Sequence, residues 1–330
     1  FIGKSIRRSG AKRLLEGRGT YVDDITLPRM VHVAFCRCPF AHAKIGAIDS
    51  EAAQATSGVI RVVTGRQLAE YCTPWIGVLT HLQGLKSAPQ HAIAVDRACW
   101  QGEAVVAVIA ETRSQAEDAV ELVEIDYQEL PVVADMETAL DDATPVIHSD
   151  LGDNLCFQRE VDIGEVDKAF ADAHCVVEET FNFGRHTGVC LETRAIIADY
   201  NPSEEHLTVY LSAQAPHMMK NLYAKHFGLN EDKVRVVCKD VGGSFGIKVH
   251  TYPDEMATGA LSIMLKRPVK FNADRLESFV TDIHARDHRV KARMAVSKEG
   301  KFLAIDMDDL TGIGPYSVYP RTSGIEANQV

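Results

Sequence analysis

The stretch Val234-Arg-Val-Val-Cys-Lys-Asp-Val-Gly-Gly-Ser-Phe-Gly-Ile-Lys248 organises the rest of the chain. Its valine-rich first half favours an extended, buried strand, because β-branched residues pack well on a pleated surface. Three glycines then permit positive φ angles and the close approach of another group, and they are Gly242, Gly243 and Gly246. A turn of this kind directs successive backbone N–H groups to one side. It can therefore hold anionic or oxo-type oxygens without a charged side chain.

Residue spacing excludes two familiar phosphate-binding loops. A Walker loop needs glycine followed directly by lysine and Ser or Thr, whereas Ile247 separates Gly246 from Lys248 and Val249 follows. A dinucleotide fingerprint needs G-x-G-x-x-G, and Ser244 stands in the place of its second glycine. The plainer alternative is a strand and turn whose glycines serve tight packing alone.

Composition limits the classes of protein to which the chain can belong. With 330 residues and 46% hydrophobic content it is globular, and its length suggests about two domains. A net charge of -11 argues against a nucleic-acid partner or an anionic membrane surface. No apolar stretch is long enough for a bilayer span, and the N-terminus lacks a signal-type apolar core. We expect a cytoplasmic protein.

The cysteines and histidines carry no metal-binding pattern. None of the eight cysteines forms a C-x-x-C pair, which argues against an iron–sulfur or zinc site in this chain. The cysteines are expected to be small buried residues, as the apolar neighbours of Cys175 suggest. The 13 histidines include no H-E-x-x-H pair. We expect no metal ligand from this chain directly.

The order of predicted elements gives an α+β chain with two successive patterns. The first has strands at 31–36, 42–48, 59–64, 104–110 and 124–130, a short helix capped by Ser50, and a helix whose capping box pairs Ser114 with Glu117. The second has helices at 167–173, 217–227 and 254–265, strands at 175–183, 195–200 and 207–212, and a hairpin at 291–310. The predicted organisation is an arm at 1–16, a domain at 17–131, a connector at 132–162 and a second domain at 163–330.

Six short segments, taken together, resemble one family. They are Gly17-Arg-Gly-Thr-Tyr-Val-Asp-Asp-Ile25, Cys38-Pro-Phe-Ala-His-Ala-Lys-Ile45, Gln101-Gly-Glu-Ala-Val105, Glu129-Leu-Pro131, Ser212-Ala-Gln-Ala-Pro216 and Asp240 to Lys248. Their order along the whole chain resembles the large, molybdenum-cofactor-binding subunits of the xanthine dehydrogenase, aldehyde oxidase and carbon monoxide dehydrogenase group. The resemblance implies an α/β hammerhead domain at 17–131, followed by an incomplete first part of a mixed α/β molybdopterin-binding domain.

The same resemblance implies a molybdenum-dependent oxidoreductase that hydroxylates or oxidises a carbon with oxygen from water. The implied cofactor is molybdopterin with molybdenum, in the cytosine dinucleotide form. The 2Fe-2S clusters and FAD are expected only on partners, an iron–sulfur small subunit and an FAD medium subunit, in a dimer of heterotrimers. The family's general-base glutamate lies in a C-terminal part that this sequence does not match, so the chain alone is expected to be inactive.

Individual site residues follow from the resemblance. Gln214 matches the glutamine whose amide donates to the metal's apical oxo group. Gly242, Gly243, Ser244, Phe245 and Gly246 match the turn beside the cofactor, with Ser244 replacing a glycine common in the family. Glu192 also matches a segment of the family, and we favour a structural role in which it pairs with Arg194 or Arg185 over a direct substrate contact.

The substrate and the activity have alternatives at this point. Purine-oxidising members of the family carry an acidic residue where this chain has Val249, so an aromatic N-heterocycle, an aldehyde or a similar small substrate is expected before xanthine. A carbon monoxide dehydrogenase-type large subunit is a second possibility within the family. A non-catalytic homologue or fragment that acts as an assembly scaffold is an alternative from another class.

Overall fold

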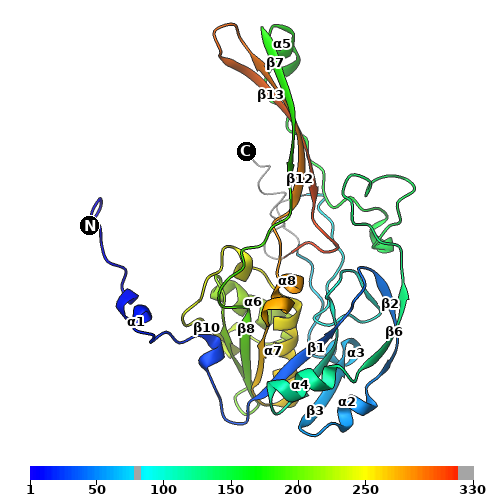
Figure 1. Cartoon of the computed structure of the whole chain (residues 1–330), viewed down its shortest axis with the longest axis vertical. Coiled ribbons are helices and arrows are strands. Elements are labelled where there is room, and N and C mark those ends of the chain that lie inside the picture. Colours follow the sequence, from blue (N-terminus) through cyan, green and yellow to red (C-terminus); the bar gives the residue numbers. More distant parts are fainter. Residues whose placement is uncertain (78–82, 319–330) are drawn as a thin grey trace.

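A seven-stranded mixed sheet forms the centre of the computed structural model, which describes residues 1–77 and 83–318 (Figure 1). The strand order is β10-β9-β8-β11-β1-β5-β3. In that order the strands are Val234–Val237, His206–Leu211, Ala195–Asn201, Val269–Asn272, Val31–Arg37, Ala104–Ala110 and Val59–Thr64. Every residue of β5 is buried, as expected for a central strand with an uninterrupted apolar sequence.

The two halves of the chain meet inside this sheet. β1 pairs in parallel with β11, with Val31 opposite Val269, and β5 pairs antiparallel with the other edge of β1. The sheet is therefore continuous from the first half to the second, although the connector separates them in sequence. The domain limits given above remain a prediction, because a shared sheet does not mark where one unit stops.

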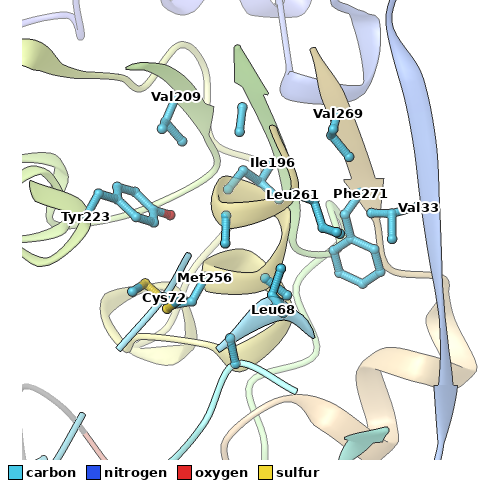
Figure 2. Close-up of a cluster of buried hydrophobic side chains, with 14 of the residues drawn as sticks. Val33, Leu68, Cys72, Ile196, Val209, Tyr223, Met256, Leu261, Val269 and Phe271 are labelled. Atoms are coloured by element: carbon cyan, nitrogen blue, oxygen red, sulfur yellow. The ribbon is translucent and has the colours of Figure 1, made fainter. Parts of the chain in front are cut away.

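Helices cover the sheet and complete the core. α7 (Pro253–Leu265) packs on β8 and β11, α6 (Pro216–Phe227) on β10, and α4 (Arg113–Val120) on β1 and β5. Figure 2 shows Leu261 and Met256 of α7 among side chains from the strands, including Ile196 and Phe271. α6 ends where Gly228 adopts a left-handed conformation, which confirms the predicted stop. The shorter helices are α1 (Ala11–Leu15), α2 (Glu51–Ala55), α3 (Gly65–Leu68), α5 (Val166–Ala171) and α8 (Arg275–Thr281).

Two three-stranded sheets flank this body. The first has the order β4-β2-β6 and consists of Arg97–Ala98, Ala43–Asp49 and Glu124–Glu129. The second has the order β13-β12-β7 and consists of Phe302–Gly312, Asp287–Val296 and Cys175–Phe183. This second sheet projects away from the body as a long arm, which is distinct from the N-terminal arm at residues 1–16 (Figure 1).

The projecting sheet has an apolar face. Its register places Met294 between Val177 and Ile305, and Ala292 between Glu179 and Met307. Since alternate residues of a strand share a face, Phe181 and Phe183 lie on the same side. The exposed apolar residues of this face are 48% to 61% accessible, and they are Val177, Phe181, Phe183, Ile305 and Met307. We call these five residues the arm face.

Several local expectations were wrong. The capping box of α4 joins Thr112 to Gln115, whereas Glu117 pairs with Arg113. Ser50 stands at the N-cap of α2 without a side-chain capping bond, and Asp49 Oδ1 instead accepts from the Glu51 N–H at 3.0 Å. Cys175 is exposed, because the first strand of the projecting sheet is accessible along its whole length. β11 and α8 were not predicted. Residues 319–330 of the second predicted domain lie outside the described part of the chain.

Candidate functional site

The glycine turn and Gln214 lie at one edge of the central sheet. β9 and β10 are parallel neighbours, so the segments that follow their C-terminal ends emerge side by side. The Gln214 N–H donates to the Lys248 carbonyl oxygen at 2.9 Å, and the Ser244 hydroxyl donates to Gln214 Oε1. The structure thus brings together the glutamine and the turn that the sequence places 30 residues apart.

The glycine turn contains backbone N–H groups that other parts of the described chain do not use. Gly243, Phe245 and Gly246 have φ angles of +102°, +48° and +89°, and Phe245 is 78% exposed. A positive φ is costly for a bulky residue, which marks this backbone as strained. In the described part of the chain, the N–H groups from Gly243 to Gly246 donate to no protein acceptor. They form a set of donors that an anionic or oxo-type ligand can accept.

Glu192 holds the start of the glycine turn by a hydrogen bond from Gly242. Its Oε2 accepts hydrogen bonds from Ser212 Oγ at 2.6 Å, Gly242 N at 2.7 Å and Lys248 Nζ at 2.9 Å. A Cβ on Gly242 would stand 2.4 Å from the Glu192 Cβ, so only glycine fits there. The expected pairing with Arg194 or Arg185 was wrong, because Lys248 takes that place.

The Glu192–Lys248 pair lies inside the protein. The Lys248 side chain is 1% exposed and that of Glu192 is 12% exposed. Lys248 Nζ also donates to Ser212 Oγ at 2.9 Å, so the lysine joins the end of β9 to the turn. Glu192 Oε1 is buried and has no hydrogen-bond partner within residues 1–77 and 83–318. One oxygen of this carboxylate therefore holds the turn while the other stays open as an acceptor.

A second buried cluster lies beneath the site around Arg194. This guanidinium donates to both carboxylate oxygens of Asp254, at 2.6 and 2.9 Å, and to Asp282 at 2.6 Å. It stacks on the Tyr252 ring at 3.7 Å, and the Tyr252 hydroxyl donates to the Ile247 carbonyl oxygen at 3.0 Å. Arg194 thereby connects the charged interior to the end of the glycine turn.

The carboxyl groups around Arg194 titrate differently. Burial alone would raise the pKa of Asp254, but the charges of Arg194 and Arg37 outweigh burial and lower this pKa to about 2. Burial raises the pKa of Glu255 to about 8, although Arg194 lies 3.5 Å away. The reason is that Asp254 and Asp282 already offset the arginine charge, so a third carboxylate gains too little to ionise.

The N-terminal arm also reaches the turn. Arg13 donates to both oxygens of Asp240, at 2.8 and 2.6 Å, and the Thr20 N–H donates to the same carboxylate at 2.8 Å. These hydrogen bonds, first of all the one from Arg13, lower the pKa of Asp240 to about 2. Asp240 stands two residues before Gly242, so the arm fixes the strand end that feeds the turn.

A large cavity lies elsewhere in the described structure. It measures about 1300 Å³ and is lined by connector residues, such as Val132 and Leu155, and by Val290, Ile305 and Met307 of the projecting sheet. None of Gln214, Glu192 and the glycine turn lines it. The donors of the turn therefore point to the sheet edge as the chemical site, while the cavity has a mixed lining of apolar and charged side chains and includes Ile305 and Met307 of the arm face.

Two sequence families match consecutive parts of the chain. The "Aldehyde oxidase and xanthine dehydrogenase, a/b hammerhead domain" family matches residues 16–131, and the "Molybdopterin cofactor-binding domain" family matches residues 147–327. The chain belongs to the molybdopterin-binding large subunits of the xanthine dehydrogenase, aldehyde oxidase and carbon monoxide dehydrogenase family. This confirms the predicted family, the hammerhead domain and the α+β fold class.

Relatives of this molybdopterin-binding large subunit cover nearly the whole chain. It is 35% identical to the nicotine 6-hydroxylase large subunit of Paenarthrobacter nicotinovorans over 98% of its length, and 34% identical to the carbon monoxide dehydrogenase large chain of Hydrogenophaga pseudoflava over 92%. It superposes on quinoline 2-oxidoreductase of Pseudomonas putida 86 with a TM-score of 0.92 and 34% identity over 97% of its length. The chain spans 39% to 40% of the length of these three proteins.

Sequence reasoning missed some residues of this molybdopterin-binding subunit. Lys248 was noticed only as part of the turn, although a lysine between Ile247 and Val249 must find an acidic partner if it is buried. Ser212 and the Arg13–Asp240 pair gave no local signal, since their partners lie far away in sequence. No helix in the described part of the chain is long and apolar enough to cross a membrane.

Proposed function

We propose that the chain is the N-terminal portion of a molybdenum hydroxylase large subunit, which oxidises a small substrate with oxygen derived from water. The observation that carries this proposal is the contact of Gln214 with the glycine turn at one sheet edge, where the N–H groups of Gly243 to Gly246 have no acceptor in the described part of the chain. A neutral amide donates hydrogen bonds without adding charge or becoming a ligand, which suits a site beside a metal–oxo group.

These residues fit the cofactor that the family implies. The Gln214 amide and the N–H groups of the turn would hold its oxygens, and a Cβ on Gly246 would meet no atom within 4 Å, so the surface there is open. When bound, molybdopterin with its molybdenum supplies the two-electron oxidation. The protein's part is to orient this group and to fix the turn through Glu192 and Lys248. We assign Glu192 to that structural role rather than to a substrate contact, because three donors already occupy its Oε2.

The substrate class follows from two observations. Val249 adds no charge beside the turn, which disfavours a purine held by an acidic residue. Two relatives are named for the N-heterocycles nicotine and quinoline. We therefore favour an aromatic N-heterocycle, with an aldehyde or a similar small molecule next. Carbon monoxide is the second candidate, because a carbon monoxide dehydrogenase large chain is about equally similar.

The partners follow from the surfaces that the chain leaves exposed. The arm face is an exposed apolar surface, and it adjoins a cavity lined in part by a connector with little secondary structure. Large exposed apolar patches often mark surfaces that bind a partner. We propose that the remaining part of the large subunit covers it and brings the general base and the contacts to a cytosine dinucleotide. The complete cytoplasmic enzyme would add an iron–sulfur small subunit and an FAD medium subunit as a dimer of heterotrimers, and this chain alone would be inactive.

The experiment that tests this proposal measures metal, pterin and oxygen source together. The chain is purified in its complete complex, and molybdenum and pterin are quantified per large subunit. The complex is then assayed with quinoline and nicotine in ¹⁸O-labelled water, and the ¹⁸O content of each product is measured by mass spectrometry. We expect about one molybdenum per large subunit and one ¹⁸O per hydroxylated product. A complex that assembles fully without molybdenum would support the scaffold alternative instead.

A further inference from the structure

Ser244 has two hydrogen-bond partners that fix the direction of its hydroxyl. Its Oγ accepts from the Lys248 N–H at 3.2 Å and lies in hydrogen-bond contact with Gln214 Oε1. A serine hydroxyl has one proton to give. Because the Lys248 N–H already donates to Oγ, that proton is free to be given to the glutamine.

This arrangement selects one orientation of the Gln214 amide. With Oε1 toward Ser244, both contacts of the hydroxyl are satisfied and the NH₂ group remains available to donate to another acceptor. If the amide were turned over, the NH₂ group would become a second donor to Oγ, and the serine proton would lose its acceptor. The main chain adds a second anchor, since the Gln214 N–H donates to the Lys248 carbonyl oxygen at 2.9 Å.

We propose that Ser244 is a positioning residue that holds the Gln214 amide with its NH₂ group directed at the bound cofactor. The inference rests on the proposed function and deepens it, because it says how this chain presents the amide donor. Nothing else in the described structure fixes the amide: Gln214 is exposed and its side chain has Ser244 as its hydrogen-bond partner. Without the hydroxyl, the Gln214 amide can rotate and present its carbonyl oxygen to the cofactor. That oxygen and an oxo group of the cofactor are both acceptors, so they would repel each other.

A double-mutant cycle in the complete complex tests this positioning role. The four proteins are the natural enzyme, Ser244→Ala, Gln214→Ala and the double variant. Each is measured for molybdenum retained after gel filtration and for kcat and KM. Losing one neutral hydrogen bond predicts a drop of about 2- to 12-fold for Ser244→Ala. If the serine acts through the glutamine, Ser244→Ala has no further effect on either measurement in the Gln214→Ala background.

Two further variants separate positioning from simple support of the turn. Ser244→Thr keeps the hydroxyl and is expected to retain molybdenum like the natural enzyme. Ser203→Ala removes an exposed hydroxyl in the turn between β8 and β9 and is expected to change neither measurement. A Ser244→Ala effect that persists undiminished beside Gln214→Ala, or a Ser244→Thr enzyme as defective as Ser244→Ala, would overturn the inference. A natural complex without molybdenum would overturn the proposed function itself, whereas a loaded complex indifferent to Ser244→Ala overturns only this inference.

Discussion

Lys248 donates from a buried ammonium group to Glu192 Oε2 at 2.9 Å, across 56 residues of sequence. This pair joins the segment before β8 to the end of the glycine turn. Ser212, at the end of β9, contacts both members. The geometry of the turn therefore depends on a largely buried charge pair, and this dependence can be measured.

The first prediction concerns that pair. Lys248→Met leaves a buried carboxylate without its counter-charge and is expected to lower the free energy of unfolding by about 3–5 kcal/mol. The double variant Glu192→Gln/Lys248→Met removes both charges and keeps an oxygen that accepts from Ser212 and Gly242, so it should be more stable than Lys248→Met alone. Urea unfolding of the complete subunit checks both values. A single variant that costs less than about 1 kcal/mol, as exposed pairs do, would contradict the prediction.

The second prediction concerns Gln214. Gln214→Ala removes a donor from a charged or strongly polar centre, which costs about 1.5–3 kcal/mol. The result is roughly a 10- to 150-fold loss of activity or cofactor retention in the complete enzyme. The exposed amide contributes little to the core, so the unfolding free energy should stay nearly unchanged. An enzyme with full molybdenum content and full turnover would remove Gln214 from the site.

The third prediction is a pH dependence of stability. Burial raises the pKa of Glu255 to about 8 and that of Glu103 to about 7. The folded protein therefore holds protons that the unfolded chain releases above pH 4.5, so stability should fall as the pH rises from 5 to 8. Glu255→Gln should reduce this slope, while the exposed control Glu231→Gln should not. Unfolding free energies at four pH values decide the matter, and an unchanged slope in Glu255→Gln would show that Glu255 ionises normally.

The fourth prediction concerns the arm face. Phe181→Ser combined with Met307→Ser makes this surface more polar without emptying a core, because the two side chains are 48% and 61% exposed. When the remaining part of the large subunit is produced as a separate polypeptide, we expect it to co-purify in clearly smaller amounts. The matched control is Lys291→Ser, an exposed residue on the opposite face of the same sheet. Equal recovery with both variants would mean that this face does not bind the rest of the subunit.

The fifth prediction tests the domain limits. Apart from trimming of the N-terminal arm, trypsin should first cleave after the exposed Arg159, because residues 130–165 contain only one short helical turn, Ser149–Leu151. The interval 100–125 holds β5 and α4 and should resist digestion. Mass spectrometry of the earliest fragments identifies the site. First cuts within 100–125 would be incompatible with this division.

Local patterns predicted most elements but not the contacts between them. The apolar run of β5, the hairpin of β12 and β13, and the Gly228 stop each depend on neighbouring residues, so the sequence was sufficient. The predicted capping box of α4, Ser114 with Glu117, lies two residues after the observed one, Thr112 with Gln115. Both hydroxyl residues stand three positions before a side chain that can complete the box, so the sequence did not distinguish them. Cys175 was misjudged because apolar neighbours in a strand do not reveal whether another layer covers them.

The site shows the same division. The family resemblance predicted that Gln214 and the glycine turn would meet, and the parallel pairing of β9 and β10 provides the physical reason. The resemblance could not predict that Glu192 pairs with Lys248. Arg194 and Arg185 were equally available in sequence, and only the packing of the folded chain determines which cation lies next to this carboxylate. The Ser244 contact also depends on side-chain geometry at the turn, which no spacing rule describes.

The pairing of β1 with β11 also sets an order in time. About 240 residues separate Val31 from Val269, and a ribosome adds on the order of 5–20 residues per second. The edge of β1 thus waits tens of seconds for its neighbour during synthesis, with its N–H and C=O groups unpaired on that side. During that interval the first half of the subunit has an incomplete sheet. We expect this to be the stage of synthesis at which chaperones are needed most.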